Sequence, residues 1–195
     1  VRDPQTVLEQ IRTLYADSGR SMLGPLGFNN TFAILVRADD ARARGLERVS
    51  QLARHAPQWK AAFGYEFLER ADGFKGLAAT YGLTFNEPPR VMDLTLIYRA
   101  LADRQADVVA GDATAGLIEA LKLFALEDDL HYFPPYDAVP VVHSATLLRH
   151  PEIGTALGRL AGRVTAAQMR RMNYAVDGEH KDVAAVVKAF LDSLN

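Results

Sequence analysis

The chain has 195 residues, 49% hydrophobic and 24% charged, proportions typical of a globular protein with one sizeable domain or two small ones. Its 22 basic and 24 acidic residues give a net charge of -2 without a long run of either sign. This argues against a nucleic-acid or membrane-surface binder, since both need a concentrated basic face. The absence of cysteine excludes thiolate nucleophiles, disulfides and cysteine-ligated zinc.

The first half of the chain alternates predicted helices with predicted strands. Asp3 and Pro4 suit a helix N-cap and first helical position, and apolar residues follow at helical spacing as far as Leu14. A connector rich in glycine, proline and asparagine (17–30) leads into TFAILVR (31–37), which has the length and composition of a buried strand. The elements expected next are two short helical pieces within 39–58, a strand at 59–65, and a helix at 74–82 that ends at a glycine.

The second half of the chain contains the last predicted strands and then only helices. The expected elements are a helix at 92–105, short strands at 106–111 and 121–128, an apolar run at 138–143, and helices at 144–149, 151–162, 165–176 and 180–194. The last helix has one apolar stripe, formed by Val183, Val186, Val187, Phe190 and Leu194. We expect Asp177 or Gly178 to cap its N-terminal end.

Strands that alternate with helices predict an α/β fold with a mostly parallel sheet. The predicted strands all lie before residue 143, whereas the region that follows is helical. A helical tail of this length needs a sheet to cover, and the strands in this sequence already have helices of their own. Because the chain also begins with Val1 and not with methionine, we expect an upstream segment that supplies the partner sheet.

The sequence contains no recognisable catalytic or metal-binding motif. Its five histidines form no HxxxH or HExxH pair, which favours surface or core positions. There is no GxSxG or GxGxxG motif, and GPLGFNN lacks the lysine and hydroxyl residue of a phosphate loop. Glu127, Asp128 and Asp129 are adjacent, so they cannot all face one site, and we interpret them as a solvated turn. We therefore expect no catalytic residue, no metal and no cofactor.

One basic residue lies within an acidic segment. In GYEFLERADGFKGL (64–77), Arg70 is surrounded by Glu66, Glu69 and Asp72. One interpretation is a surface salt-bridge cluster, which would contribute little stability. The other is a guanidinium fork presented near a glycine turn to a carboxylate ligand. Spacing alone favours the surface cluster.

Four segments of the chain, taken together, resemble a known family. In their order and spacing they are similar to the glycine betaine/choline class of substrate-binding proteins of ABC importers. The resemblance extends over essentially the whole chain. The segments are PLGFNNTFAILVR, EFLERADGFKGL, LEDDLHYFPPYDAVPVV and LAGRVTAAQMRRMNYAVD.

The resemblance implies an α/β fold of the two-lobed periplasmic-binding-protein type (type II, or Venus flytrap), in which two lobes close on a ligand around a hinge. The chain would cross between the lobes near Asn30–Phe32 and again near Pro134–Tyr136. Residues 33–135 would form the second lobe. Residues 1–32 and 136–195 would belong to the first lobe, which would be incomplete in this sequence.

The segment EDDLHYFPPYDAVPVV (127–142) is an acidic corner rich in aromatic residues, and its Pro-Pro pair makes it rigid. The ligand class of that family explains why such a corner would contain so many aromatic residues. A quaternary ammonium group cannot donate hydrogen bonds, so a protein holds it with aromatic faces and carboxylates, each cation–π contact contributing about 0.5–2 kcal/mol. A betaine also has a carboxylate, which an arginine or lysine would bind.

The resemblance also implies which residues contact the ligand. Tyr136 of FPPY matches a cage tyrosine, and Phe32 matches a second cage position that is usually tyrosine. Asn30 matches a polar position beside it, and Arg70 matches the residue that grips the ligand carboxylate. Asp112 stands where a third cage aromatic is expected, and there it could pair with a cation or accept hydrogen bonds from a ligand N–H group. Core packing for the two rings and a cap or turn role for Asp112 are the structural alternatives.

The resemblance predicts a non-enzymatic solute-binding protein that captures a quaternary-ammonium or betaine-type osmolyte and delivers it to the transmembrane subunit of an ABC permease. Its expected location is periplasmic or otherwise extracytoplasmic, with the membrane reached only through the permease or a lost anchor. Because the cage is altered, a different cationic or zwitterionic ligand such as an ergothioneine-like compound is the first alternative. A truncated lobe that binds nothing alone and an enzyme on the same scaffold are the others.

Overall fold

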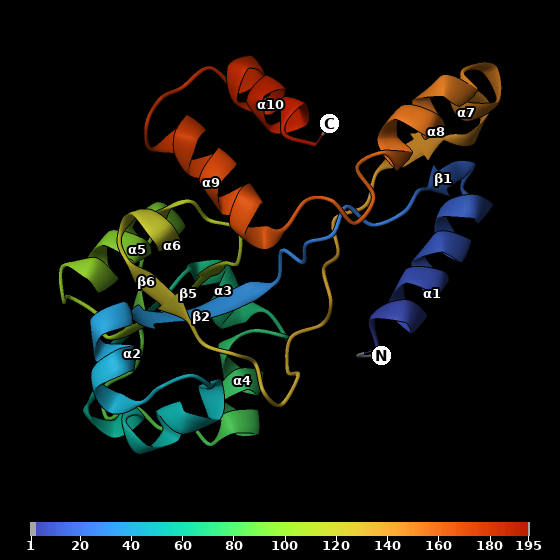
Figure 1. The fold of residues 1–195 in the computed structure, drawn as a ribbon. Helices are drawn as coiled ribbons and strands as arrows, with labels where there is room; N and C mark the ends of the chain where they lie inside the picture. Colours follow the sequence, from blue (N-terminus) through green and yellow to red (C-terminus); the bar gives the residue numbers. More distant parts are fainter. Residues whose placement is uncertain (1–2, 195) are drawn as a thin grey trace.

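The computed structural model describes residues 3–194, and the predicted helices and strands occur in the predicted order (Figure 1). Short strands at 20–22 and 90–91 and short helices at 65–69 and 117–120 are additional to the prediction. The helices are α1 (Pro4–Asp17), α2 (Ala38–Arg44), α3 (Tyr65–Glu69), α4 (Phe74–Tyr81), α5 (Leu94–Ala102), α6 (Leu117–Ala120), α7 (Ser144–Arg149), α8 (Pro151–Gly158), α9 (Ala166–Asp177) and α10 (Val183–Asp192), with 3-10 turns η1 (Val49–Arg54) and η2 (Ala56–Gln58). The strands are β1 (Arg20–Met22), β2 (Phe32–Arg37), β3 (Ala61–Phe63), β4 (Arg90–Val91), β5 (Val108–Asp112), β6 (Leu123–Ala125) and β7 (Val141–His143).

Five of the strands form one sheet in the order β4-β3-β5-β2-β6. The pairs β3–β4 and β3–β5 are parallel, whereas β2 runs antiparallel to both of its neighbours, β5 and β6. Four of the five strands therefore run in the same direction, as the prediction of a mostly parallel sheet requires, and only β2, the second strand from one edge, runs against them. This arrangement brings the first residue of β2, Phe32, directly opposite the last residue of β5, Asp112.

The interior strand β2 is buried on both faces, as its continuous apolar sequence predicts. Ile34 and Val36 point into a core built with the aromatic residues of β3 and α3. Ala33 and Leu35 point into a second core built with α5 and α6. Full burial of a side chain of this size contributes about 1.5–3 kcal/mol. The strand is thus a rigid support for the residues at its N-terminal end.

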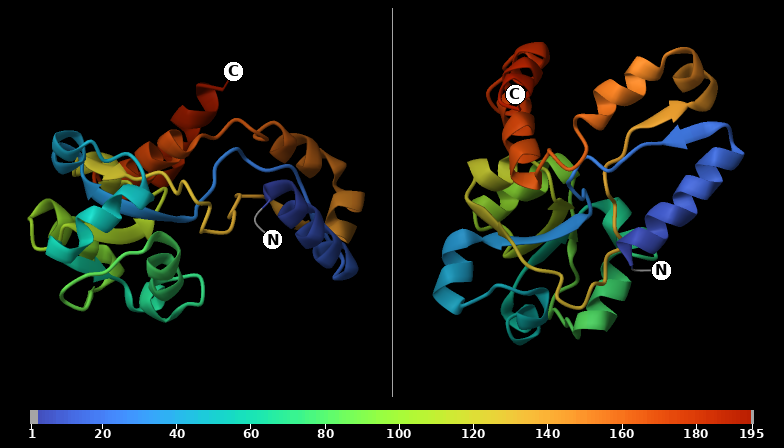
Figure 2. Two further views of the ribbon diagram at one scale, coloured as in Figure 1. Left: turned by 90° about the horizontal axis from the view of Figure 1, so that it is seen from below. Right: turned by 45° about the vertical axis from the view of Figure 1, so that its right-hand side comes forward.

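A second part of the molecule is built from the two-stranded sheet β1–β7 with α1, α7 and α8. Two extended segments connect it to the five-stranded sheet, and both views of Figure 2 show them running between the two parts. The segments are hydrogen-bonded to each other: Asn29 and Asp137 form an isolated β-bridge, and the Asn30 N–H donates to the Tyr136 carbonyl at 3.0 Å. The predicted crossing residues Asn30 and Tyr136 therefore lie side by side.

The helix α9 lies against the five-stranded part of the molecule and contacts α6 (Figure 1). Arg170 donates to the carbonyl of Ala113 and Asn173 donates to the carbonyl of Thr114, both at 2.9 Å. These two bonds attach α9 to the loop that follows β5. The assignment of residues 136–195 to the first lobe stays a prediction about the full-length protein.

Helix ends were predicted with mixed success. Asp3 caps α1 through its side chain, and Gly82 ends α4 in the left-handed conformation at φ 66°, so both predictions are confirmed. The predicted cap of α10 is wrong: Asp177 is the last residue of α9 and Gly178 is its C-cap. The side chain of Asp182 caps α10 instead. The helix α9 therefore includes Asp177, and α10 begins at Val183, three residues after the predicted start at residue 180.

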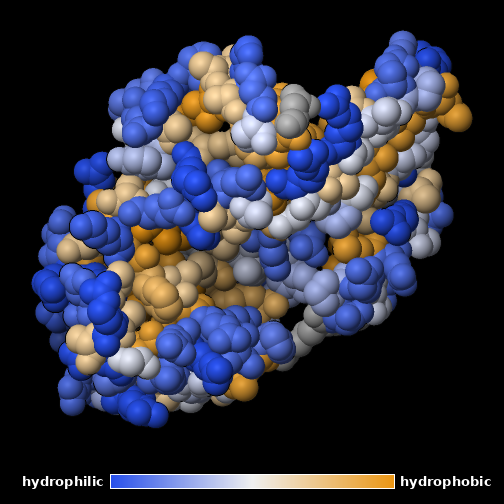
Figure 3. All heavy atoms as spheres, viewed as in Figure 1, coloured by the Kyte–Doolittle hydropathy of each residue, from blue (hydrophilic) through white to orange (hydrophobic). Residues whose placement is uncertain are grey.

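Apolar side chains remain at the surface of the terminal helices. Val183, Val187 and Leu191 of α10 are 57%, 45% and 42% exposed, and Leu148 of α7 is 85% exposed. In the space-filling view, orange side chains lie at the surface over α10 and over α7 and α8 (Figure 3). Among residues 3–194, no helix combines the length and the apolar character needed to cross a membrane.

Candidate ligand-binding site

A crevice opens at the sheet edge where β2 begins and β5 ends, a position typical of ligand sites in α/β proteins. Its narrower cavity has a volume of about 190 Å³ and is lined by Asn30, Thr31, Phe32, Glu66, Arg70, Leu94, Asp112 and Tyr136. All five predicted site residues are among them. A wider cavity of about 780 Å³ shares Asn30, Leu94 and Asp112 with it and extends towards the end of α9. We refer to the two cavities together as the crevice.

Tyr136 is fixed where the second crossing segment passes the first. Its backbone N–H donates to the Asn29 side chain at 2.9 Å, and its carbonyl accepts from Asn30. Its hydroxyl accepts from the Arg70 guanidinium at 2.7 Å. The same hydroxyl donates to Asp72 at 3.4 Å. The residue is 43% exposed, so Tyr136 is accessible at the crevice while four hydrogen bonds hold its position.

The guanidinium of Arg70 is bound on several sides. Its Nε and Nη2 donate to the two carboxylate oxygens of Asp72 at 2.7 and 2.8 Å, and its Nη1 donates to Glu66 at 3.1 Å. The bond to Asp72, followed by that to Glu66, raises the pKa of Arg70 further above its usual value, and the bond from Arg70 lowers the pKa of Asp72. The salt-bridge cluster is therefore confirmed, and Arg70 also lines the crevice, whereas its binding of a ligand carboxylate stays a prediction.

Phe32 presents only part of its ring to the crevice. The ring packs against Phe67 and Phe133 at centroid distances of 4.8 and 5.9 Å. The Arg70 guanidinium carbon lies 5.6 Å from the Phe32 ring centroid. The predicted cage ring is therefore partly core and partly covered by a protein cation.

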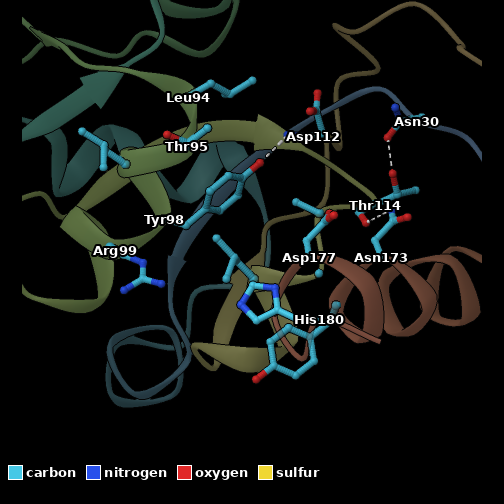
Figure 4. A pocket seen from close by; sticks show the side chains of 16 residues that line it. Asn30, Leu94, Thr95, Tyr98, Arg99, Asp112, Thr114, Asn173, Asp177 and His180 are labelled. Carbon is cyan, nitrogen blue, oxygen red and sulfur yellow. Dashed lines mark hydrogen bonds between the residues drawn. The ribbon is translucent and has the colours of Figure 1, made fainter. Parts of the chain in front are cut away.

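Asp112 is the half-buried acid of the crevice. Its backbone N–H donates to the Tyr98 hydroxyl at 2.9 Å, a bond drawn in Figure 4. Among residues 3–194, no group donates a hydrogen bond to its carboxylate or forms an ion pair with it. Burial raises the pKa of Asp112, and the negative charge of Glu66 raises it further. Asp112 neither caps a helix nor closes a turn through its side chain, so the geometry favours its interpretation as a ligand contact.

Asn30 is held at the junction of the two cavities. Its side-chain oxygen accepts from the Thr114 hydroxyl at 2.6 Å, and Asn173 of α9 donates to the Thr114 carbonyl. Figure 4 shows this chain of bonds from the crossing segment through the loop after β5 to α9. The polar position predicted at Asn30 is therefore tied to two other elements.

The acidic corner before the two prolines is not the solvated turn that the sequence suggested. The carboxylate of Asp128 accepts hydrogen bonds from the Tyr81 hydroxyl and from the backbone N–H groups of Tyr132 and Phe133, the latter two at 2.9 and 2.8 Å. Asp128 therefore folds the aromatic segment onto the sheet domain. Only Glu127 behaves as expected, in an exposed ion pair with Arg48.

Sequence reasoning missed several lining residues. Leu94 and Thr114 carry no local motif, and they reach the crevice only because α5 and the loop after β5 converge there. Asp177, the last residue of α9, and His180, which follows the helix, line the far end of the wider cavity (Figure 4). Glu66 was recognised as a neighbour of Arg70 but not as a lining residue. Within the described part of the chain, no group of three or more acids and histidines could hold a metal ion.

Comparison with known proteins agrees with this geometry. Residues 4–193 match the family described as the substrate binding domain of the ABC-type glycine betaine transport system. The carnitine transport binding protein OpuCC of Listeria monocytogenes is 32% identical over 100% of this chain, and a glycine-betaine-binding protein of Pseudomonas aeruginosa is 35% identical over 97% of it. The chain spans 64% of the length of each of these two proteins.

The fold is also that of a solved relative. A crystal structure described as a glycine betaine/carnitine/choline ABC transporter superposes on 99% of this chain with a TM-score of 0.93 and 33% identity, and the match covers 71% of that structure. The observed α/β architecture is therefore that of a substrate-binding protein. The chain belongs to the family of substrate-binding domains of ABC-type glycine betaine transport systems.

Proposed function

We propose that the full-length protein captures a quaternary-ammonium compound outside the cytoplasm and delivers it to an ABC permease without changing it chemically. The observation that carries this proposal is that Asn30, Phe32, Arg70, Asp112 and Tyr136, which are far apart in sequence, line one cavity. The functions of the two relatives, carnitine binding and glycine betaine binding, support the same ligand class.

The lining suits a group that carries positive charge but donates no hydrogen bonds. Tyr136 supplies an aromatic ring, and Glu66 and Asp112 supply negative charge on the same wall. Micromolar affinity requires about -8 kcal/mol, which several such contacts reach when closure excludes water. Arg70 remains the predicted partner of a ligand carboxylate, for ligands that have one.

We also propose the lobe assignment that follows from the two crossing segments. Residues 33–135 form the second lobe, and residues 1–32 and 136–195 belong to the first. The side-by-side segments at Asn29–Asn30 and Tyr136–Asp137 act as the hinge. Ligand binding closes the lobes, and the closed form is the one that docks on the permease.

A calorimetric titration of the full-length protein tests the ligand class. We expect saturable one-to-one binding of a trimethylammonium compound and at least about a tenfold loss of affinity in Tyr136→Ala, since the ring contributes about 0.5–2 kcal/mol and also holds Arg70. Tyr136→Phe keeps the ring and should stay within about threefold of the unmodified protein.

The matched control is Phe124→Ala, which removes a partly exposed ring (37%) from β6, outside the crevice. It should leave the affinity unchanged. Equal affinities for Tyr136→Ala and Phe124→Ala would reject the site. Binding of an ergothioneine-like compound in place of simple trimethylammonium compounds would transfer the proposal to that ligand.

A further inference from the structure

The arginine that would bind a ligand carboxylate already binds a carboxylate of the protein. Asp72 accepts two parallel hydrogen bonds from the Arg70 guanidinium, at 2.7 and 2.8 Å. This is the fork geometry with which arginine binds a free carboxylate. Glu66 and the Tyr136 hydroxyl occupy further donors of the same group. A carboxylate-bearing ligand would have to displace one of these partners.

The displacement is unfavourable because the competitor is intramolecular. Asp72 lies two residues from Arg70 on the same turn, so its effective concentration is in the millimolar range or above. A ligand present at micromolar concentration competes poorly against such a partner. The guanidinium is therefore not a ready acceptor site for a second anion.

The charge balance of this wall is negative. Glu66 and Asp112 line the narrower cavity with Arg70, and Asp72 is paired with Arg70 beside it, so three carboxylates and one guanidinium give this wall a net charge of -2. At the far end of the wider cavity, Arg99 and Asp177 add one charge of each sign and do not change the balance. A cation is attracted to such a wall, whereas the carboxylate of a zwitterion is repelled.

Asp112 is the acid that has no other role. Asp72 and Glu66 both pair with Arg70, whereas the half-buried carboxylate of Asp112 receives no hydrogen bond or ion pair from any residue between 3 and 194. A carboxylate that is partly removed from water and unpaired is stabilised when a cation arrives next to it. Asp112 is paired with Phe32 in the register of β2 and β5, and Phe32 is one of the predicted cage residues.

We propose that the crevice selects a quaternary-ammonium cation without a carboxylate, such as a trimethylammonium alcohol, over carboxylate-bearing betaines, and that Asp112 is the residue that determines this preference. The inference rests on the proposed function and narrows its ligand class. Arg70 then acts as a positioning residue, which holds the Tyr136 hydroxyl and covers the Phe32 ring.

Choline and glycine betaine are the matched probes, because both carry a trimethylammonium group and differ mainly in an alcohol against a carboxylate. Calorimetry on the full-length protein should give at least about tenfold tighter binding of choline. Asp112→Asn should weaken choline binding at least about tenfold and glycine betaine binding by a smaller factor, so that the ratio of the two affinities decreases. Asp103→Asn, an exposed aspartate at the end of α5, should change neither affinity.

The outcomes separate this inference from the proposed function. Glycine betaine binding as tightly as choline, or tighter, would reject the preference and leave the quaternary-ammonium function standing. An equal loss for both ligands in Asp112→Asn would remove Asp112 as its determinant. If neither ligand binds, both proposals fail. Should Asp112→Asn not fold, the ratio of the two affinities in the unmodified protein still decides the preference.

Discussion

The backbone and the side chain of Asp112 differ in how they are held. Its backbone N–H is anchored by the hydroxyl of Tyr98, whose pKa is raised to about 12 by burial. Among residues 3–194, no group donates a hydrogen bond to its carboxylate, whose pKa is raised by burial and by the negative charge of Glu66. Because the pKa of Asp112 is higher in the folded protein than its ordinary value of 3.8, folding favours the protonated acid. The contribution of Asp112 to the stability of the free protein therefore falls as the pH rises from 3.8 through the raised pKa.

Ligand binding should depend on this titration. A bound cation favours the ionised acid, so we expect affinity to be constant above the raised pKa of Asp112 and to fall as pH drops through it, starting at a higher pH than for an ordinary aspartate. The other titratable or charged groups around the crevice are Glu66 of α3, Arg70 and Asp72 after it, Tyr98 and Arg99 of α5, Tyr136 of the crossing segment, and Asp177 and His180 at the end of α9.

Affinity titrations between about pH 4 and 8 measure this dependence. Asp112→Asn should remove the loss of affinity at low pH (the acid limb of the profile of affinity against pH). It should leave unchanged any pH dependence of the affinity that comes from other groups. His180→Gln provides the complementary variant and should leave the acid limb intact. An acid limb that persists unchanged in Asp112→Asn would assign the titration to another group.

At the scale of the element, the acidic corner of residues 127–136 shows how a loop obtains a fixed shape. Asp128 accepts three hydrogen bonds, two of them from the backbone of the aromatic stretch that follows. The two prolines fix φ immediately afterwards, and Tyr136 is the next residue. The corner therefore positions the ligand-facing ring through a carboxylate that is itself outside the crevice.

Asp128→Asn should destabilise the protein by about 1–3 kcal/mol, because an amide nitrogen replaces an acceptor and leaves a half-buried N–H without a partner. Chemical denaturation measures this change in the free energy of unfolding. Glu127→Gln is the control, since an exposed ion pair contributes at most about 1 kcal/mol. Similar unfolding midpoints for the two variants would show that the corner does not depend on Asp128.

The sequence predicted this corner as a rigid aromatic segment but not its support. Element positions followed from periodicity, and the caps at Asp3 and Gly82 followed from residue type. The cap of α10 did not, because Asp177 and Asp182 are both acceptable N-cap residues and only the continuation of α9 distinguishes them.

At the scale of the whole molecule, the two crossing segments connect the parts that would move. They are joined to each other at Asn29–Asn30 and Tyr136–Asp137, and both contribute residues to the crevice. A rotation about this junction would change the separation of the walls while the buried strand β2 stays rigid. A ligand that contacts both walls of the crevice at once would favour the closed form.

Small-angle X-ray scattering of the full-length protein should show a smaller radius of gyration when the protein is saturated with a trimethylammonium ligand. At the same ligand concentration, Tyr136→Ala should keep the larger, open value, because it binds the ligand more weakly. Phe124→Ala should close as the unmodified protein does. Superimposable scattering curves with and without bound ligand would show that the crossing segments are not a hinge.

The sequence alone determined the order of the predicted elements and the buried character of β2, because these depend on residue type and local spacing. Its resemblance to a known family indicated five of the eight residues that line the narrower cavity. Tertiary structure alone decided that β2 runs against its neighbours, that Asp72 and Glu66 accept hydrogen bonds from Arg70, and that the Asp112 carboxylate has no partner among residues 3–194. Pairings between segments far apart in the chain depend on how the elements pack, and no local pattern encodes them.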